Sequence, residues 1–311
     1  MNKELLRAQI EKHINLVKDE TKSFNLMLSG GIDSGVLAAM GDPDMVISVK
    51  LPYGDKYDEF KDMERTVKHL GLEDRWVVLE LDNYDIHQTM VEAIKAIGRP
   101  IPHFNIFPLF VAYRAAEKMG LSSIVVGDGP DESMCGYTRH LISKYLYDIY
   151  NFEAFYHYEP TIAKILPKFE ENYANLIRKT ISEVKPIMDK HKSLTRKMCA
   201  TDMELMRPDM DEMGNKLAQS FGLQVYRPYQ YPEIDEFMFN LPDEDKIHNV
   251  EYGKYLLRLI AADYLPEEVA WRKQKIGGPL VPMNKLLGIN ESEFSKEGYM
   301  AYQERILNEV R

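Results

Sequence analysis

Short apolar runs alternate with longer amphipathic stretches through the first 126 residues of the chain. The apolar runs predict buried strands, and the stretches between them show the spacing of helices. The predicted strands are 24–28, 45–49, 76–81 and 124–126, and the predicted helices between them are 31–40, 57–70, 86–97 and 108–119. Such alternation favours a parallel sheet with helices on both faces. We therefore predict a doubly wound α/β fold, whose ligands bind beyond the carboxyl ends of the strands.

The segments that flank this core are predicted to be mostly helical. The N-terminal segment is an amphipathic helix with Leu5, Leu6, Ile10 and Ile14 at its apolar positions. Tyrosines are frequent after residue 141, and we expect them to pack between helices rather than to hold a cofactor. A second helical block, broken by prolines, starts near residue 208. The sequence thus predicts a helix at 1–22, an α/β core at 23–140 and a mostly helical part at 141–311.

Composition excludes several classes of protein. The chain has 311 residues and a formal net charge of −10, so nucleic acid is a poor candidate partner. No apolar run is long enough to span a membrane, and the N-terminus has no signal-peptide core. Cys135 and Cys199 form no C-x-x-C pair and suggest no disulfide framework. We predict a cytoplasmic protein without a membrane partner.

One loop carries the strongest local signal for chemistry. Ser29-Gly30-Gly31-Ile32-Asp33-Ser34 lies between the first predicted strand and the next helix. Glycines allow the backbone to approach phosphate oxygens, and a helix N-terminus presents free N–H groups to an anion. The hydroxyl groups of Ser29 and Ser34 can donate to the same oxygens. Because no lysine follows the glycines, the loop differs from the P-loop of kinases and GTPases.

Together with three further motifs, this loop resembles a known family. S-G-G-I-D-S resembles the pyrophosphatase loop of N-type ATP pyrophosphatases, a superfamily that includes the asparagine, NAD and GMP synthetases. The other three motifs are similar to patterns of the asparagine synthetases: the Y-D-E at 57–59, G-D-G-P-D-E-S-M-C-G-Y at 127–137, and the segment 253–272 with K-Y-L-L-R and L-P-E-E-V-A-W-R. The resemblance covers about residues 20–285. It implies an adenine nucleotide alpha hydrolase-like sheet with additional C-terminal helices, and ATP as a substrate.

The resemblance also implies roles for individual residues. Asp33 and Asp131 are expected to hold Mg²⁺ on the triphosphate, since Mg²⁺ prefers one or two carboxylates with phosphate oxygens. A cation is needed where negative charge develops, and Lys275 is the first choice and Lys273 the second. Asp128 is expected to steer an amine or to act as a base. Lys254 either contacts phosphate or faces solvent. The residues expected to bind ATP or pyrophosphate are Met27, Ser29, Gly30, Gly31, Asp33, Ser34, Val49, Gly127 and Lys254.

The chain departs from the family pattern at several positions. Residue 2 is Asn, where glutamine-dependent asparagine synthetases have a catalytic cysteine after Met1, so we expect no glutaminase half. Nitrogen would then come from free ammonia, from a separate glutaminase subunit, or from an amine already on a substrate. Asp128 replaces the family glutamate, and the family's E-x-R-x-P-F reads Gln224-Val225-Tyr226-Arg227-Pro228-Tyr229. These changes leave the identity of the small-molecule carboxylate open.

Three functions remain after these comparisons of residues. The first is an ATP-dependent carbon–nitrogen ligase that activates a carboxylate as an acyl-adenylate and releases AMP and pyrophosphate. The second is adenylation and amination of a nucleobase or nucleotide, and the third is a nucleotide-binding partner subunit without catalysis. The retained Asp33, Asp131 and nearby lysines argue against the third, and relatives of the second kind commonly carry cysteine clusters or basic surfaces, which this sequence lacks. We expect residues 141–206 to shape the acceptor pocket or an interface, and the sequence leaves the oligomeric state open, a homo-oligomer included.

Overall fold

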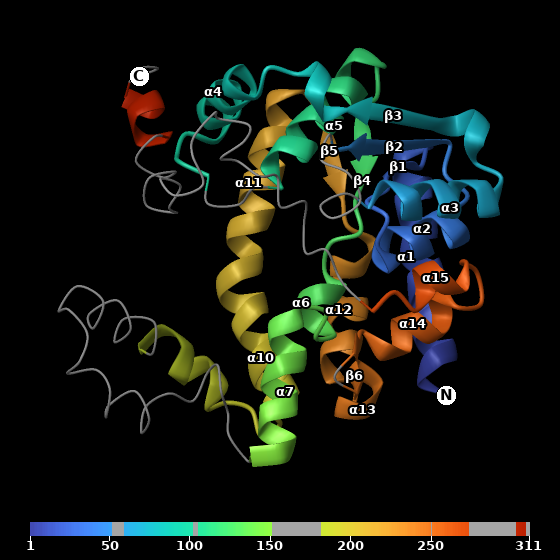
Figure 1. Cartoon of the computed structure of the whole chain (residues 1–311), viewed down its shortest axis with the longest axis vertical. Helices are drawn as coiled ribbons and strands as arrows, with labels where there is room; N and C mark the ends of the chain where they lie inside the picture. The colour runs from blue at the N-terminus through green and yellow to red at the C-terminus, as the bar shows by residue number, and fades with distance from the viewer. Residues whose placement is uncertain (52–58, 102–104, 151–181, 250, 274–302, 309–311) are drawn as a thin grey trace. The chain divides into compact units, whose positions relative to one another are not determined.

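The computed structural model describes residues 1–51, 59–101, 105–150, 182–249, 251–273 and 303–308 (Figure 1). Two compact units emerge from the contacts within the chain. One comprises Met1–Gln9, Asp128–Pro208 and Tyr229–Ile260, and we call it the helical unit. The other comprises Ile10–Gly127, Asp209–Pro228 and Ala261–Arg311, and we call it the sheet unit. The division of the sequence into 1–22, 23–140 and 141–311 stays a prediction.

A five-stranded parallel sheet forms the centre of the sheet unit. Its strands stand in the order β3-β2-β1-β4-β5, with bounds β1 Asn25–Met27, β2 Met45–Lys50, β3 Trp76–Glu80, β4 Ser123–Val125 and β5 Gln224–Tyr226. Parallel registers such as Met27 opposite Ile47 fix the neighbours of β1. The chain moves from β1 toward β3 and then returns to the other side of β1 with β4. The order therefore reverses between β1 and β4, which is the place where open α/β sheets bind ligands.

Helices cover both faces of this sheet, as the sequence predicts. They are α2 Ile32–Gly41, α3 Phe60–Leu70, α4 Ile86–Ile97, α5 Ile106–Lys118, α11 Arg207–Ser220 and α15 Glu267–Ala270, with short 3₁₀ turns at Glu73–Arg75 and Leu81–Asn83. Right-handed crossovers place α2 and α3, which follow β1 and β2, on the face opposite α4 and α5. The doubly wound α/β fold is confirmed.

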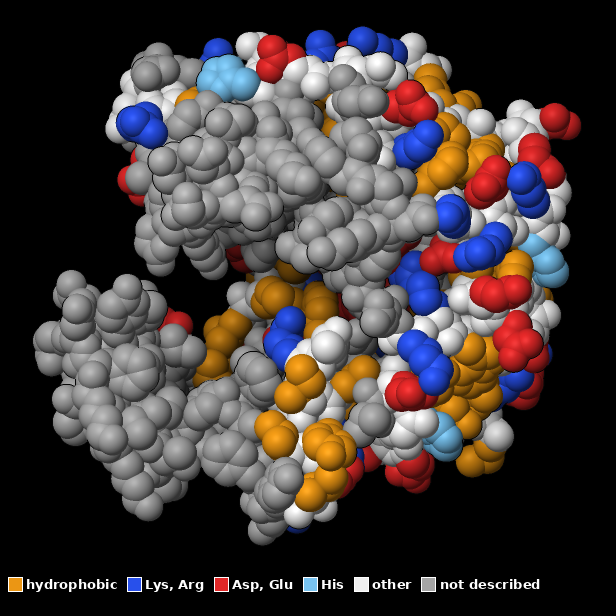
Figure 2. Space-filling model, viewed as in Figure 1, with side chains coloured by type: hydrophobic (Ala, Val, Ile, Leu, Met, Phe, Trp, Pro, Cys, Tyr) orange, Lys and Arg blue, Asp and Glu red, His pale blue; other side chains and the backbone are white. Residues whose placement is uncertain are grey.

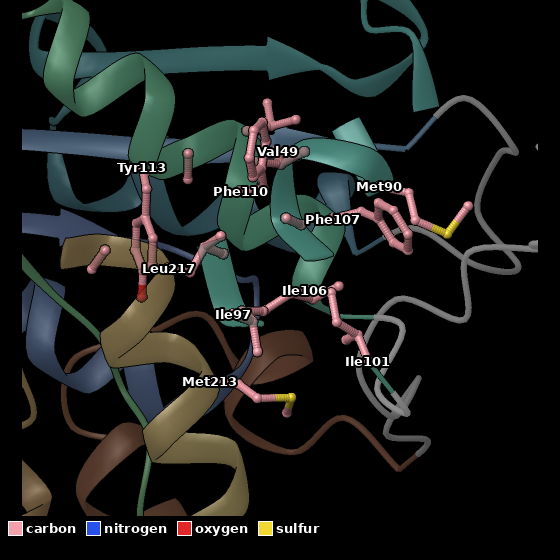
Figure 3. Packing of buried hydrophobic residues seen from close by; sticks show 14 of the residues in the cluster. Val49, Met90, Ile97, Ile101, Ile106, Phe107, Phe110, Tyr113, Met213 and Leu217 are labelled. Atoms are coloured by element: carbon pink, nitrogen blue, oxygen red, sulfur yellow. The ribbon is translucent and has the colours of Figure 1, made fainter. Parts of the chain in front are cut away.

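The largest described core lies between the sheet and helices α4, α5 and α11 (Figure 3). Val49 of β2 points into it together with Phe107 and Phe110 of α5 and Leu217 of α11. Burying side chains of this size contributes roughly 1.5–3 kcal/mol each. Because β2 alternates its side chains between faces, Ile47 and Val49 face this core, whereas Ser48 donates from the other face to the Leu28 carbonyl oxygen at 3.0 Å.

Two features of the sheet unit differ from the sequence prediction. The segment after residue 208 was predicted to be helical, but Gln224–Tyr226 forms strand β5 and pairs with β4. A three-residue strand before a proline shows too little alternation to be recognised alone. The predicted helix at 57–70 is observed as α3 from Phe60, and its first residues lie outside the described part of the chain.

The helical unit contains the acidic motif and the segments that surround it. Its elements are α6 Pro130–Ser133, α7 Thr138–Tyr150, a helix at residues 182–188, α10 Leu194–Thr201, a π-helix at Asp202–Met206, α12 Pro232–Asn240, α13 Asp243–Lys246 and α14 Tyr255–Ala261. Strands β6 Ile247–Asn249 and β7 Tyr252–Gly253 form an antiparallel pair that the predicted helical block did not include. A small core joins Cys135, Met198, Cys199 and Ile247.

Two helices of the chain show contrasting surfaces. Helix α1 Asn2–Thr21 is the predicted amphipathic helix, with Leu6, Ile10 and Ile14 buried. Leu5, which was predicted on the same apolar side, is instead exposed. Helix α7 instead exposes Ile142, Tyr145 and Ile149, and Figure 2 shows hydrophobic side chains gathered on this part of the surface. Within the described residues, no helix combines the length and the apolar character that crossing a membrane requires.

Candidate functional site

The turn between β1 and α2 is held by hydrogen bonds between its own two serines. The Ser29 N–H donates to Ser34 Oγ at 3.1 Å, and the two hydroxyl oxygens are 3.2 Å apart. Ser34 is buried, whereas Ser29 is exposed and Asp33 half-buried in the first turn of α2. Gly31 is the N-cap residue of α2, and, lacking a side chain, it makes no cap hydrogen bond to this helix. The turn therefore presents backbone N–H groups and a hydroxyl at a helix N-terminus.

Gly30 and Gly31 of this turn differ in whether the backbone and the packing require glycine. Gly30 has φ +80°, and a Cβ there would lie 2.7 Å from the Glu59 carbonyl oxygen. The fold therefore requires glycine at position 30. Gly31 has φ −82° and ψ 165°, which any residue adopts, and a Cβ would make only one ordinary contact, 3.6 Å from Ser29 Oγ. Nothing in the described protein requires glycine at position 31.

Gly127 brings the end of β4 against the start of α2. A Cβ on Gly127 would lie 2.8 Å from the Ser34 backbone nitrogen, a group that cannot move without moving the turn. The loops that follow β1 and β4 thus touch where the strand order reverses. The residues predicted to lie near adenine occupy this region: Met27 ends β1, and Val49 lies two residues beyond Ile47, the partner of Met27 in β2.

A buried ion-pair cluster connects the turn to the C-terminal motif. Arg272 pairs with Glu59 through one guanidinium nitrogen and with Asp62 at 2.6 Å through the other. Burial alone would lower the pKa of Arg272, but the two carboxylates more than offset burial and raise it. Since the Glu59 carbonyl packs on Gly30, Arg272 holds the segment that supports the turn.

The L-P-E-E-V segment packs on the same helices. A Cβ on Gly35 of α2 would lie 2.8 Å from the Leu265 side chain, and α15 packs against α3. Lys273, the last described residue of this segment, is exposed. Lys275, the first choice for the catalytic cation, lies outside the described residues. Arg272 therefore fixes the point from which the lysine segment starts.

In the helical unit, Asp131 of α6 forms an ion pair with Lys254. Lys254 Nζ lies 2.8 Å from Asp131 Oδ1, and the Lys254 residue is only 4% exposed. Its backbone N–H donates to the Met134 carbonyl oxygen at 3.1 Å, from a φ of +53°. Lys254 therefore does not face solvent, one of the two alternatives left open by the sequence. Asp128, two residues before α6, is exposed.

Glu132, next to Asp131, is a buried carboxyl group. Burial and the negative charge of Asp131 raise the pKa of Glu132 to about 8, so that it holds a proton near neutral pH. The Tyr137 hydroxyl donates to Glu132 Oε1, and burial also raises the pKa of Tyr137. The sequence motif contained both residues, but their burial and pairing become visible only in the folded chain.

Comparison with known proteins identifies the family. The sequence model of the asparagine synthase family matches residues 3–298 of this chain. The chain belongs to the asparagine synthase family. Asparagine synthetase B (glutamine-hydrolyzing) of Escherichia coli strain K12 is 20% identical over 303 residues, which cover 88% of this chain and 44% of that protein. Asparagine synthetase 2 (glutamine-hydrolyzing) of Oryza sativa subsp. japonica is 26% identical over 149 residues, 43% of this chain and 24% of that protein. The chain thus spans less than half the length of these curated relatives.

Within the asparagine synthase framework, the sheet unit brings together the turn at 29–34, Gly127, Glu59 and the C-terminal motif. The helical unit brings together Asp131, Glu132, Tyr137 and Lys254. The roles assigned from the sequence to Asp33, Asp128, Asp131, Lys254, Lys273 and Lys275 stay predictions. The Y-D-E and L-P-x-x-V motifs were recognised in the sequence, but the pairing of Arg272 with Glu59 and Asp62 was not. The acidic and basic side chains in these motifs were the sequence signal from which the ion pairs could have been inferred.

Proposed function

We propose that this asparagine synthase family member is an ATP-dependent carbon–nitrogen ligase. It activates a carboxylate as an acyl-adenylate, releases pyrophosphate, and transfers the acyl group to an amine nitrogen with release of AMP. Membership of the family supports an ATP-dependent ligase in general. The acyl-adenylate route and the reaction of the whole protein are parts of the proposal.

The observation that carries the proposal is the missing Cβ at Gly31. The backbone angles of Gly31 suit any residue, and the only described atom near a Cβ would be Ser29 Oγ at 3.6 Å. A side chain at this position would instead occupy the space directly before the N-terminus of α2. Glycine at this place lets phosphate oxygens approach the N–H groups of the first helical turn. The turn therefore fits the triphosphate of ATP.

The chemistry of the turn favours pyrophosphate as the leaving group. The α2 N-terminus and the Ser29 hydroxyl stabilise negative charge that accumulates on the β- and γ-phosphates when the α-phosphorus is attacked. The carboxylate oxygen forms a bond to the α-phosphorus, and the bond from that phosphorus to the bridging oxygen of pyrophosphate breaks. Ser34 acts by holding the Ser29 backbone in place.

Magnesium is a further part of the proposal. Among the described residues, no group of three or more His, Cys, Asp or Glu side chains is arranged to hold a metal ion. Mg²⁺ bound to nucleotide needs only one or two carboxylates, and half-buried Asp33 in the first turn of α2 fits as one of them. When bound, the ion would neutralise charge on the phosphate oxygens. The role of Asp131 as a second ligand stays a prediction.

The second half of the reaction needs an amine and a cation. Nucleophilic nitrogen attacks the acyl carbon, and AMP leaves with the carboxylate oxygen that attacked phosphorus. We assign the cation to Lys275 or Lys273, which follow the anchored Arg272, and the steering of the amine to Asp128. Glutamine hydrolysis appears in the names of the relatives. For this chain we propose ammonia as the simplest nitrogen source, delivered free or by a separate glutaminase subunit, with a substrate amine as the alternative.

The test is pyrophosphate release from ATP and Mg²⁺ across a panel of small carboxylates, with and without ammonium. We expect release to depend on one carboxylate, and Asp33→Asn to lower it by at least about a hundredfold. Asp42→Asn is the matched control, because Asp42 is the exposed C-cap residue of the same helix and pairs only at the surface with Arg75. The control should retain full activity.

Two outcomes would contradict the proposal. If Asp33→Asn releases pyrophosphate as fast as the parent protein, Asp33 is not part of the site. Tight ATP binding without pyrophosphate release, with every carboxylate and with ammonium, would favour a nucleotide-binding subunit without catalysis.

A further inference from the structure

The two cysteines of the chain meet in the core of the helical unit. Cys135 follows α6 and Cys199 lies on α10, 64 positions apart in the sequence, yet their sulfur atoms are 3.4 Å apart. Both side chains are buried and both are free thiols. Sulfur atoms at this separation need only a small shift to reach bonding distance, about 2 Å.

A buried lysine ammonium lies beside this pair. Lys246 is fully buried, its Nζ donates to the Phe239 carbonyl oxygen at 2.7 Å, and it lies 3.8 Å from Cys199 Sγ. Burial raises the pKa of the Cys199 thiol, but the hydrogen bond with Cys135 and the charge of Lys246 more than offset burial and lower it to about 6. The Ser133 carbonyl oxygen, 3.3 Å from Cys199 Sγ, acts in the opposite direction because it favours the thiol.

Burial and the neighbouring Cys199 have the opposite effect on the partner. They raise the pKa of the Cys135 thiol well above its ordinary value. The two sulfurs therefore differ: Cys199 has the lower pKa and is the better nucleophile, whereas Cys135 keeps its proton. A pKa difference of this sign distinguishes the thiol that reacts first from the thiol that resolves the product.

The backbone at Cys135 is held tightly. Cys135 has φ +57°, a left-handed conformation that is strained for a residue other than glycine. A Cβ on Gly253 would lie 2.1 Å from the Cys135 carbonyl oxygen, and a Cβ on Gly136 would lie 1.8 Å from Asp131 Oδ1. The cysteine therefore sits in a close-packed loop that also positions Asp131. A shift of the Cys135 sulfur is transmitted to this loop.

We propose that Cys135 and Cys199 are a modification site, at which a hydroperoxide forms a reversible disulfide that displaces helix α6, which carries Asp131 and Glu132. The Cys199 sulfur attacks a peroxide oxygen and gives a sulfenic acid and hydroxide. The Cys135 sulfur then attacks the sulfenic sulfur, the sulfur–sulfur bond forms, and hydroxide leaves and takes up the remaining proton. In total, two thiols and hydrogen peroxide give one disulfide and two water molecules.

The chemical part of this proposal stands apart from the ligase reaction. The reduced protein is treated with a small excess of hydrogen peroxide, denatured, alkylated with a maleimide and weighed intact. We expect a product that has lost two hydrogen atoms and takes up no maleimide, and dithiothreitol should restore two alkylation sites. Cys199→Ala should lose the protected species, because its one remaining thiol has no partner. Two alkylatable thiols after peroxide treatment, or sulfinic acid in place of the disulfide, would overturn the proposal.

The functional part rests on the proposed ligase activity. We expect the disulfide form to release pyrophosphate at least about tenfold more slowly than the reduced form, and dithiothreitol to restore the rate. Cys135→Gly is the matched control, because glycine relieves the positive φ and removes the sulfur, so peroxide should leave its rate unchanged. A disulfide that leaves the rate unaltered would contradict the displacement of helix α6. A reduced protein without any pyrophosphate release would contradict the proposed function and leave the disulfide standing.

Discussion

At the scale of single residues, Gly30 and Gly31 separate the requirements of folding from those of ligand binding. Gly30→Ala combines a positive φ with a contact of 2.7 Å to a carbonyl oxygen, so it should destabilise the protein by about 2–3 kcal/mol. Gly31→Ala should leave the free energy of unfolding within about 1 kcal/mol of the parent value, since its angles suit alanine.

The activity of these two variants is then informative. Gly31→Ala should raise the KM for ATP, or slow pyrophosphate release, by at least about tenfold. Its stability in urea unfolding should stay close to that of the parent protein. A fully active Gly31→Ala variant would show that phosphate does not approach this position. Gly71→Ala is a control with a positive φ, since a Cβ there meets no described atom within 4 Å, and it should affect only stability.

Glu132 gives a prediction about pH at the same scale. Its pKa is about 8 in the folded chain and near 4.5 when unfolded, so the folded state binds more protons between these values. The stabilisation is complete below pH 4.5 and is lost as pH rises through 8. Between pH 6 and pH 8, the parent protein should lose about 2 kcal/mol of stability relative to Glu132→Gln. Urea unfolding of both proteins at several pH values measures this, and parallel pH profiles would contradict it.

At the scale of elements, the pairing of Arg272 with Glu59 and Asp62 holds α15 and the start of α3 together. Arg272→Met removes the less exposed of the two arginines that pair with Asp62, which also pairs with Glu59, and we expect a loss of about 3 kcal/mol in urea unfolding. Arg65→Met is the matched control, because Arg65 also pairs with Asp62 but its side chain is 49% exposed. It should cost less than about 1 kcal/mol. Equal losses in the two variants would show that the Arg272 cluster does not link these elements.

The helices and strands also show which parts of the fold can be predicted from the sequence. Helix α4 was predicted at 86–97, which are its observed bounds, and the structure adds that Asp85 caps its start and Gly98 follows its end. Strand β5 escaped notice because Gln224–Tyr226 gains its structure from pairing with β4, not from its own pattern. The turn at 29–34 was predicted from glycine and helix-terminus physics, whereas the Arg272 cluster depends on contacts across more than 200 positions. Such contacts leave no periodic signal.

At the scale of the whole molecule, the motifs that resemble the family pattern are divided between two units. The sheet unit holds the turn, Gly127, Glu59 and the C-terminal motif, and the helical unit holds Asp131, Glu132 and Lys254. The boundary between the units falls directly after Gly127. The strand order reverses next to β1, so the turn at 29–34 lies at the place where open α/β sheets bind ligands. Membership of the asparagine synthase family and this topology agree on an ATP-dependent ligase as the function to test.

The most direct test of the central claim follows oxygen from the carboxylate. The carboxylate that supports pyrophosphate release is labelled with ¹⁸O, the reaction is run with ATP and ammonium, and the nucleotide product is analysed by mass spectrometry. Attack on the α-phosphorus predicts AMP that carries one ¹⁸O atom from the carboxylate, together with unlabelled pyrophosphate. Label in inorganic phosphate with ADP as the nucleotide product would mean that an acyl phosphate forms instead. Unlabelled AMP would contradict the acyl-adenylate altogether.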